Sequence, residues 1–260
     1  MKLAANLGTM FTEHPGLVQR YEAAAKAGFQ YVETPFPYSE NAANLSSLLS
    51  QLKLSQELIN APPGGDGERG LACLPGREAE FQRGIEEAIH YAKALNCPRI
   101  HAMAGLRPEE HLLLAAEESY ERNIRYAAQR LAKEGLTLLI EPINPTTMPG
   151  YFLRSVDQAL GFIEKIKEPN LKLLLDVFHV QQICGSLSAT IKRCWPHIGH
   201  IQMAQVPNRG SPSSPGEINF PFIFKLLQEE GYAGVIGLEY NSAQHTPDTL
   251  AWVRECGLAL

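Results

Sequence analysis

Short apolar runs alternate with longer amphipathic stretches along the whole chain, which is the pattern of repeated βα units. One predicted helix begins near a proline, repeats apolar positions at helical spacing, and is followed by Gly28 as a C-terminal cap. The eight predicted strands are Leu3–Leu7, Tyr31–Glu33, Ser55–Ile59, Arg99–Met103, Thr137–Glu141, Lys172–Asp176, Ile198–Met203 and Val235–Glu239. The eight predicted helices are Pro15–Ala27, Asn41–Gln51, Arg77–Ala94, Pro108–Lys133, Ser155–Lys167, Ser188–Trp195, Pro221–Glu230 and Pro247–Glu255.

Eight parallel βα units have one obvious closed arrangement, the (β/α)₈ TIM barrel, which leaves no sheet edge exposed. A doubly wound open sheet is the alternative. It is disfavoured because no G-x-G-x-x-G follows the first strand, and Gly8-Thr9-Met10 does not resemble a phosphate-binding turn. The length of 260 residues and the hydrophobic content of 45% also suit one barrel. We therefore predict an α/β fold with a single domain over residues 1–260.

Composition excludes several classes of partner. The formal net charge of −5 lacks the basic excess with which proteins bind a phosphate backbone, so nucleic acid is not an expected partner. No stretch approaches the ~20 consecutive apolar residues that span a membrane, and the apolar start is too short for a signal sequence. Five scattered cysteines without a C-x-x-C pair are expected to be reduced. We expect a cytoplasmic protein without a membrane partner, and assembly into a homo-oligomer stays open.

Two connections are longer than is usual between elements of a barrel, namely Asn60–Gly76 and Gln205–Glu217. Both follow predicted strands, so both belong to the face of the barrel where active sites are built. Their glycines and prolines suit shaped loops over a pocket, although plain surface loops are the alternative.

Three predicted strands run from apolar residues directly into a carboxylate: Glu141, Asp176 and Glu239. A fourth strand delivers Gln202 near its end. These are the fifth to eighth strands, and the carboxyl ends of neighbouring barrel strands meet at one side of the barrel mouth. We therefore expect the four side chains to converge.

Three carboxylates in a site of low dielectric would repel one another unless a cation compensates their charge. One strand-end acid alone is as easily explained by a helix cap or a salt bridge. Four oxygen-bearing side chains together favour a metal, and the absence of sulfur favours a hard ion over Zn²⁺. We predict that Glu141, Asp176, Gln202 and Glu239 bind a divalent cation, Mg²⁺ or Mn²⁺.

Five further residues are candidates by their position near the barrel mouth. His179 follows Asp176 on the loop that we expect to leave the sixth strand, and its ring can polarise a substrate oxygen. Arg209 lies in the long loop after Gln202 and can pair with a carboxylate. His101 and Asn60 end the fourth and third strands, and we assign them to substrate binding with His179 and Arg209. His200 shares a strand face with Gln202 and is expected to support it from behind.

The sequence resembles the hydroxypyruvate isomerases, a branch of the xylose-isomerase-like barrel proteins, over nearly its whole length. The resemblance is strongest in Glu141-Pro142-Ile143-Asn144, Asp176-Val177-Phe178-His179, His200-Ile201-Gln202, Pro215-Gly216-Glu217-Ile218-Asn219 and Gly237-Leu238-Glu239-Tyr240. It implies the same four metal ligands, with Glu141 and Glu239 as the catalytic acid/base pair. Related sugar epimerases have a histidine where this chain has Gln202, which favours a keto acid as substrate.

The resemblance implies isomerisation of hydroxypyruvate to tartronate semialdehyde through an enediolate. Two positions depart from the family pattern: an acidic residue is usual near Thr147, and a lysine is usual at Asn241. Both changes leave the substrate less certain than the reaction, so an isomerase of 2-oxotetronate is an alternative, followed by a ketose 3-epimerase. A metal-dependent phosphodiesterase of the endonuclease IV type would need more histidine ligands and a basic surface. A barrel that binds without catalysis is the remaining class.

Overall fold

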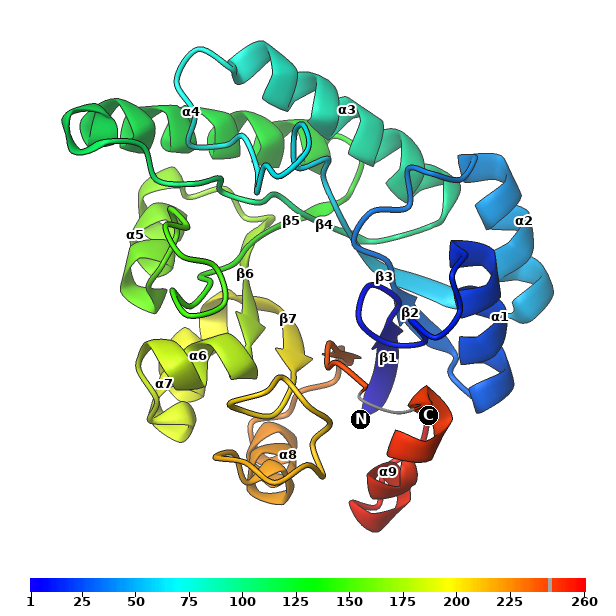
Figure 1. The fold of residues 1–260 in the computed structure, drawn as a ribbon. Helices are drawn as coiled ribbons and strands as arrows, with labels where there is room; N and C mark the ends of the chain where they lie inside the picture. Colours follow the sequence, from blue (N-terminus) through cyan, green and yellow to red (C-terminus); the bar gives the residue numbers. More distant parts are fainter. Residues whose placement is uncertain (243–244) are drawn as a thin grey trace.

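The computed structural model describes residues 1–242 and 245–260, and its strands close into a parallel barrel in the order β1 to β8 (Figure 1). Each strand pairs with the next one in sequence, and β1 pairs with β8 to complete the ring. The strands are β1 (Lys2–Asn6), β2 (Tyr31–Glu33), β3 (Ser55–Asn60), β4 (Arg99–His101), β5 (Thr137–Ile140), β6 (Leu171–Asp176), β7 (Ile198–Met203) and β8 (Val235–Leu238). The predicted TIM barrel is confirmed.

Helices surround the barrel, as Figure 1 shows. They are α1 (Leu17–Ala27), α2 (Ala42–Leu52), α3 (Glu78–Ala94), α4 (Leu113–Ala132), α5 (Val156–Ile166), α6 (Val177–Ile183), α7 (Leu187–Cys194), α8 (Phe220–Glu229) and α9 (Ala251–Glu255), with 3₁₀ turns η1 (Glu110–Leu112), η2 (Trp195–His197) and η3 (Thr246–Thr249). Gly28 ends α1 in the left-handed conformation (φ 103°), as predicted. The short helix α6 was not predicted, because it continues directly from β6 without a turn signal.

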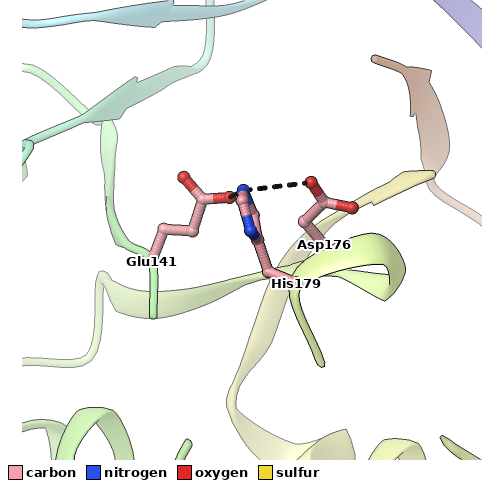
Figure 2. A group of neighbouring side chains, drawn as sticks. All are labelled: Glu141, Asp176 and His179. Atoms are coloured by element: carbon pink, nitrogen blue, oxygen red, sulfur yellow. Dashed lines mark ion pairs between the residues drawn. The ribbon is translucent and has the colours of Figure 1, made fainter. Parts of the chain in front are cut away.

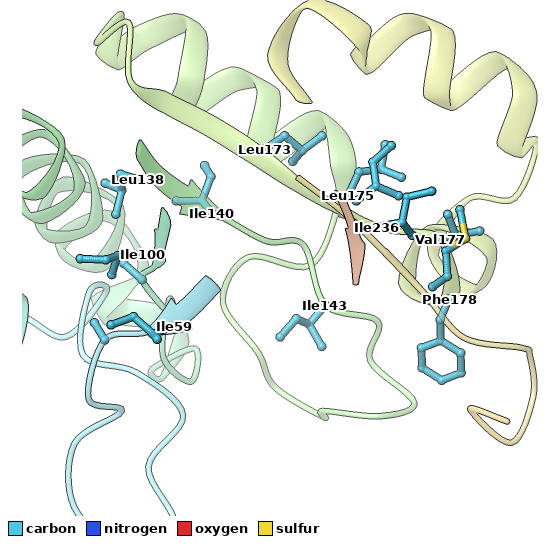
Figure 3. Packing of buried hydrophobic residues seen from close by; sticks show 14 of the residues in the cluster. Ile59, Ile100, Leu138, Ile140, Ile143, Leu173, Leu175, Val177, Phe178 and Ile236 are labelled. Atoms are coloured by element: carbon cyan, nitrogen blue, oxygen red, sulfur yellow. The ribbon is translucent and has the colours of Figure 1, made fainter. Parts of the chain in front are cut away.

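Side chains alternate between the two faces of each strand, and this alternation decides which residues face the barrel axis. The outward residues of the strands pack with the helices in the main apolar core, which includes Ile100, Leu138, Ile140, Leu173, Leu175 and Ile236 (Figure 3). Leu58, Leu139 and Leu174 form a separate small cluster. Leu174 shares its strand face with Asp176, and Leu139 shares its face with Glu141. On β5 and β6 the inward face is thus apolar at mid-barrel and polar at the carboxyl end, whereas on β7 the polar residue His200 lies opposite Leu174 at the same depth.

The two long loops differ in what they contact. Residues 61–76 pack on the segment after β4, where the Cys73 N–H donates to the Ala104 carbonyl at 2.8 Å and the Gly105 N–H donates to the Arg69 carbonyl at 3.1 Å. Residues 205–217 instead reach the end of β8, because the Asn241 N–H donates to the Arg209 carbonyl at 2.7 Å. Within residues 1–242 and 245–260, no helix is both long and apolar enough to cross a membrane.

Candidate active site

A cavity of about 270 Å³ opens at the carboxyl ends of the strands. Six of the residues predicted for the site line this cavity: Asn60, His101, Glu141, His179, Arg209 and Glu239. A narrower pocket shares several of these walls and reaches Gln202 and the leucines at mid-barrel. Of the four residues that the strand ends suggested, Glu141, Gln202 and Glu239 therefore line these two adjoining pockets, whereas Asp176 lines neither.

The strand register pairs two of the predicted metal ligands directly. Asp176, the last residue of β6, lies opposite Gln202 of β7. Glu141 and Glu239 are the first residues after β5 and β8. Glu141, Asp176 and His179 offer ligand atoms that all lie within 4.8 Å of one another (Figure 2).

Burial disfavours the ionised form of these carboxyl groups. It raises the pKa of Glu141 well above its usual range, and the nearby charges of Glu239 and Asp176 raise this pKa further. Burial also raises the pKa of Asp176 to about 6 and that of Glu239 to about 7, although the positive charge of Arg209 opposes both shifts. Full ionisation of all three groups at neutral pH therefore requires more positive charge than Arg209 alone supplies.

Two buried oxygens at this site have no hydrogen-bond partner among the residues that the structure describes, namely Glu141 Oε1 and Gln202 Oε1. A buried polar atom without a partner costs about 1–3 kcal/mol. Coordination of a cation by these oxygens would remove that cost. The predicted donor set of three carboxylates and one amide oxygen contains no sulfur, which is the ligand chemistry that hard cations such as Mg²⁺ and Mn²⁺ prefer.

Arg209 brings a guanidinium into the same site from the loop after β7. Its Nη2 lies 3.2 Å from Asp176 Oδ2 and 3.0 Å from Glu239 Oε2. Its Nε donates to the backbone carbonyl of Glu239 at 3.1 Å. The guanidinium carbon lies 5.0 Å from the ring centre of Phe178, which is a cation–π contact. Arg209 is therefore held from two sides at the edge of the carboxylate cluster.

His179 lies in α6 rather than on the predicted loop. Asp176 caps this helix, since its Oδ1 accepts the Phe178 N–H at 2.9 Å. The helical turn then points His179 Nε2 at the cluster, 3.6 Å from Asp176 Oδ2 and 3.8 Å from Glu141 Oε1 (Figure 2). The Asp176 side chain thus both caps the start of α6 and belongs to the carboxylate cluster.

Hydrogen bonds around Asn144 determine which nitrogen of His179 carries the proton. The Thr147 N–H can only donate, and it donates to Asn144 Oδ1 at 2.8 Å. The amide nitrogen of Asn144 therefore faces His179 Nδ1, at 2.7 Å, and the Asn144 backbone N–H points at the same atom from 3.4 Å. Because both groups donate, Nδ1 accepts and the proton is on Nε2. Burial lowers the pKa of His179 well below its usual range, so the ring is neutral and presents Nε2–H to the cluster.

His101 and Asn60 border the cavity beside Glu141. His101 Nδ1 lies 3.9 Å from Glu141 Oε2, and burial lowers the pKa of His101 to about 3, so this ring is also neutral. His101 Nε2 has no hydrogen-bond partner in the described part of the chain. The backbone carbonyl of Asn60 accepts a hydrogen bond from the Tyr38 hydroxyl at 2.5 Å. Both positions can contact a molecule bound in the cavity.

Comparison with known proteins identifies the family. A sequence profile described as xylose isomerase-like TIM barrel matches residues 21–256. Hydroxypyruvate isomerase from Escherichia coli (strain K12) is 40% identical, with 97% of this chain and 98% of that protein covered. The 2-oxo-tetronate isomerase from Cupriavidus necator is 42% identical, with 97% of each chain covered. The chain belongs to the hydroxypyruvate isomerase family.

A solved structure matches the present chain over nearly the whole length of both proteins. The crystal structure of AP endonuclease, family 2 from Brucella melitensis is 42% identical to it, with a TM-score of 0.93 and 98% of each chain covered. The resemblance seen in the sequence motifs is thereby confirmed, and the enzyme class of the chain is that of the family, isomerase.

One buried acid of the site was not predicted. Glu33, the last residue of β2, is fully buried, and its carboxylate accepts hydrogen bonds from Gln202 Nε2 at 2.7 Å and from Asn6 Nδ2 at 3.1 Å. His200 Nε2 contacts the other carboxylate oxygen. The predicted strand Tyr31–Glu33 also ends on a carboxylate, so the rule applied to the other strands could have found it. It was missed because no apolar run precedes it.

The two departures from the family pattern lie at the rim of the site. Thr147 lines the cavity, is exposed, and bonds to Asn144 through both its N–H and its hydroxyl. Asn241 is exposed, and its N–H anchors the Arg209 carbonyl. Neither departure changes a carboxylate of the cluster.

Proposed function

We propose that this chain interconverts hydroxypyruvate and 2-hydroxy-3-oxopropanoate, which is tartronate semialdehyde. The reaction removes a proton from C3 and adds one at C2, while O3 loses its proton and O2 gains one, with an enediolate between the two states. This exchange needs two acid/base groups on one bound substrate. The observation that carries the proposal is that Glu141 and Glu239 line the same cavity, next to Arg209 and His179.

In this proposal one of Glu141 and Glu239 removes the proton from the hydroxyl-bearing carbon, and the other returns a proton to its neighbour. The two glutamates have different surroundings. Glu239 Oε2 contacts the Arg209 guanidinium at 3.0 Å, whereas Glu141 Oε1 faces His179 Nε2 from 3.8 Å. These different contacts suit two different tasks in one catalytic cycle.

We further propose that Glu141, Asp176, Gln202 and Glu239 hold Mg²⁺ or Mn²⁺, a proposal supported by the unpartnered oxygens of Glu141 and Gln202. When bound, the cation would offset the negative charge that develops on the substrate oxygens. His179 donates its Nε2–H to one of these oxygens.

We assign the remaining predicted residues of the cavity to substrate binding. The guanidinium of Arg209 attracts the substrate carboxylate. His101 and Asn60 contact the rest of the small acid within the same walls. A substrate with a carboxylate is favoured over a neutral sugar, because Arg209 places a partly buried cation at the cavity edge.

A second candidate substrate is 2-oxotetronate, because a relative named for that activity is 42% identical over 97% of the chain. It carries one more hydroxyl-bearing carbon than hydroxypyruvate, and this carbon would extend toward the rim at Thr147. The same proton transfer between adjacent carbons serves both acids. Turnover of each acid, and of a neutral ketose for comparison, ranks the substrates.

The test replaces each glutamate by the amide of the same shape. We expect Glu141→Gln and Glu239→Gln to lower kcat by about 10²–10⁴-fold while still folding. Exchange of the C3 hydrogen of hydroxypyruvate with D₂O, followed by NMR, should fall in parallel. Glu86→Gln on α3 is the matched control, since Glu86 pairs with Arg130 outside the site. Wild-type turnover in both site variants, folded and with Mn²⁺ bound, would show that the proton assignments are wrong.

A further inference from the structure

The side-chain amide of Gln202 could face the carboxylate cluster with either of its two ends. The oxygen and the nitrogen of an amide have nearly the same shape, but only the oxygen can bind a cation. Gln202 is buried, so water does not select between the two orientations. A neighbouring group must make that selection.

Glu33 provides an acceptor for one end of this amide. Gln202 Nε2 donates to Glu33 Oε2 at 2.7 Å, and this oxygen also accepts the Asn6 amide N–H. The flipped amide would place the oxygen of Gln202 against the accepting oxygen of Glu33 and would lose this hydrogen bond. With the nitrogen held by Glu33, Gln202 Oε1 is the free end, and it is buried without a hydrogen-bond partner among the described residues.

Glu33 is itself held in place by other donors. Asn6 Nδ2 donates to Glu33 Oε2 at 3.1 Å, and His200 Nε2 donates to Glu33 Oε1. The other ring nitrogen of His200, Nδ1, has no partner in the described part of the chain, in agreement with a proton on Nε2. Three side chains therefore point donors at this one carboxylate, and a rotated Glu33 would leave at least one donor unpaired.

A glycine in β8 makes room for the carboxylate. Gly237 lies opposite Gln202 in the register of the two strands. A Cβ atom at Gly237 would lie 2.1 Å from Glu33 Oε1 and 2.5 Å from Glu33 Oε2, which is far closer than atoms can approach. The carboxylate of Glu33 thus occupies the space that a side chain at this position would fill.

We infer that Glu33 is a positioning residue, which turns the carbonyl oxygen of Gln202 toward the cation that we propose for the site. The inference rests on the proposed metal site. It assigns Glu33 no direct contact with cation or substrate, and it gives His200 and Asn6 the task of fixing Glu33.

The first test measures the affinity of the metal-free protein for Mn²⁺ alone, by electron paramagnetic resonance. Glu33→Gln keeps the shape of the side chain but leaves one acceptor oxygen for three donors, and the new amide N–H can donate to the oxygen of a flipped Gln202. We expect Mn²⁺ to bind about 10–100-fold more weakly to this variant, as is typical when a partner of a metal ligand is removed.

A double-mutant cycle separates orientation from charge. In a Gln202→Leu background no amide remains to be oriented, so adding Glu33→Gln should change Mn²⁺ affinity by no more than about twofold. An equal loss in both backgrounds would mean that Glu33 acts through its negative charge, and the inference would be wrong. A wild-type protein that binds no Mn²⁺ would overturn both this inference and the proposed metal site, whereas the equal loss leaves the metal site intact.

A second variant preserves every ligand and every charge. Gly237→Ala should displace the Glu33 carboxylate and weaken Mn²⁺ binding by about tenfold or more. Gly199→Ala in β7 is the matched control, because its Cβ would crowd the barrel mainly against Lys172 and Leu139, with Lys172 Cβ at 2.5 Å. Weakened binding in Gly237→Ala alone supports the inference. Equal Mn²⁺ affinity in the two variants overturns it, whether or not Glu33→Gln folds.

Discussion

Replacing Asn144 by aspartate tests the proton position that the structure assigns to His179. Asn144 is fully buried and donates its amide N–H to His179 Nδ1 at 2.7 Å and to the Thr147 hydroxyl at 3.0 Å. Aspartate has the same shape but would offer an acceptor oxygen at this place. The Thr147 hydroxyl can rotate to donate, whereas His179 Nδ1 must gain a proton to do so. We expect the proton of His179 to move from Nε2 to Nδ1.

The size of the effect follows from these contacts. Leaving two acceptors face to face at 2.7 Å costs about 1–3 kcal/mol, and a hydrogen bond from Nδ1–H to a carboxylate contributes about 1.5–3 kcal/mol. A combined difference of about 3 kcal/mol favours the new tautomer by roughly a hundredfold. Nε2 then presents a lone pair to Asp176 and Glu141. Loss of one preorganised donor in an active site lowers kcat by about 10²–10³-fold.

The ¹⁵N chemical shifts of the histidine rings report the tautomer directly, and steady-state kinetics report kcat. Asn170→Asp is the control, since the Asn170 amide donates to two backbone carbonyls at 2.9 Å near the start of β6. We expect this control to lose stability with an unchanged His179 ring. A wild-type His179 with its proton on Nδ1 would refute the assignment. Wild-type kcat in Asn144→Asp with the proton moved would show that the Nε2–H donor has no part in turnover.

Three further outcomes are expected. The raised pKa values of Asp176, about 6, and Glu239, about 7, mean that the folded metal-free protein binds more protons than the unfolded chain, so its stability falls as pH rises through that range. Below about pH 6.5 the buried neutral histidines oppose this trend, because they would be protonated in the unfolded chain; above it they no longer do. Tm of the metal-free protein should therefore be lower at about pH 8 than at about pH 6.5, and excess Mg²⁺ should abolish the difference. Equal Tm values without metal would contradict this. Arg209→Lys should raise KM for hydroxypyruvate by about tenfold or more. A lysine cannot bridge Asp176 and Glu239 in the same geometry, so the positive charge that we assign to the substrate carboxylate would be displaced. An unchanged KM would exclude Arg209 from binding the substrate carboxylate. Tyr21→Phe removes two buried hydroxyl hydrogen bonds, including one of 2.8 Å to Gln56 Oε1, and should lower the free energy of unfolding by about 1–3 kcal/mol in a urea titration; a loss below about 0.5 kcal/mol would contradict this.

Local sequence pattern was sufficient to predict the barrel. Most strands carry a short apolar run, and each of the longer helices shows an apolar stripe, so the order of elements follows from hydrophobic periodicity. The expectation that a carboxylate at the end of a strand faces the barrel mouth also depends only on local sequence. Side chains alternate along a strand, and the last residue of the inward face lies at the mouth. Glu141, Asp176 and Glu239 could therefore be proposed together before any contact was known.

Boundaries and short elements were less predictable. The predicted fourth strand extends to Met103, whereas β4 ends at His101, and α6 replaces the predicted loop after Asp176. In both cases the decisive interactions are tertiary. Just after β4, the Ala102 N–H donates to the Leu139 carbonyl of the neighbouring strand β5 at 3.1 Å, and α6 starts where the Asp176 carboxylate caps it.

The sequence by itself determined the barrel, the family and the four residues expected to bind a cation. Only the tertiary structure showed that Glu33 holds Gln202, that Arg209 bridges two carboxylates, and that Asn144 sets the proton on His179. The physical reason is separation along the chain. Glu33 and Gln202 are 169 residues apart, and no local pattern reports which donor meets which acceptor once the barrel has closed. Periodicity decides which face a side chain takes, whereas hydrogen-bond partners depend on how the closed ring brings distant strands together.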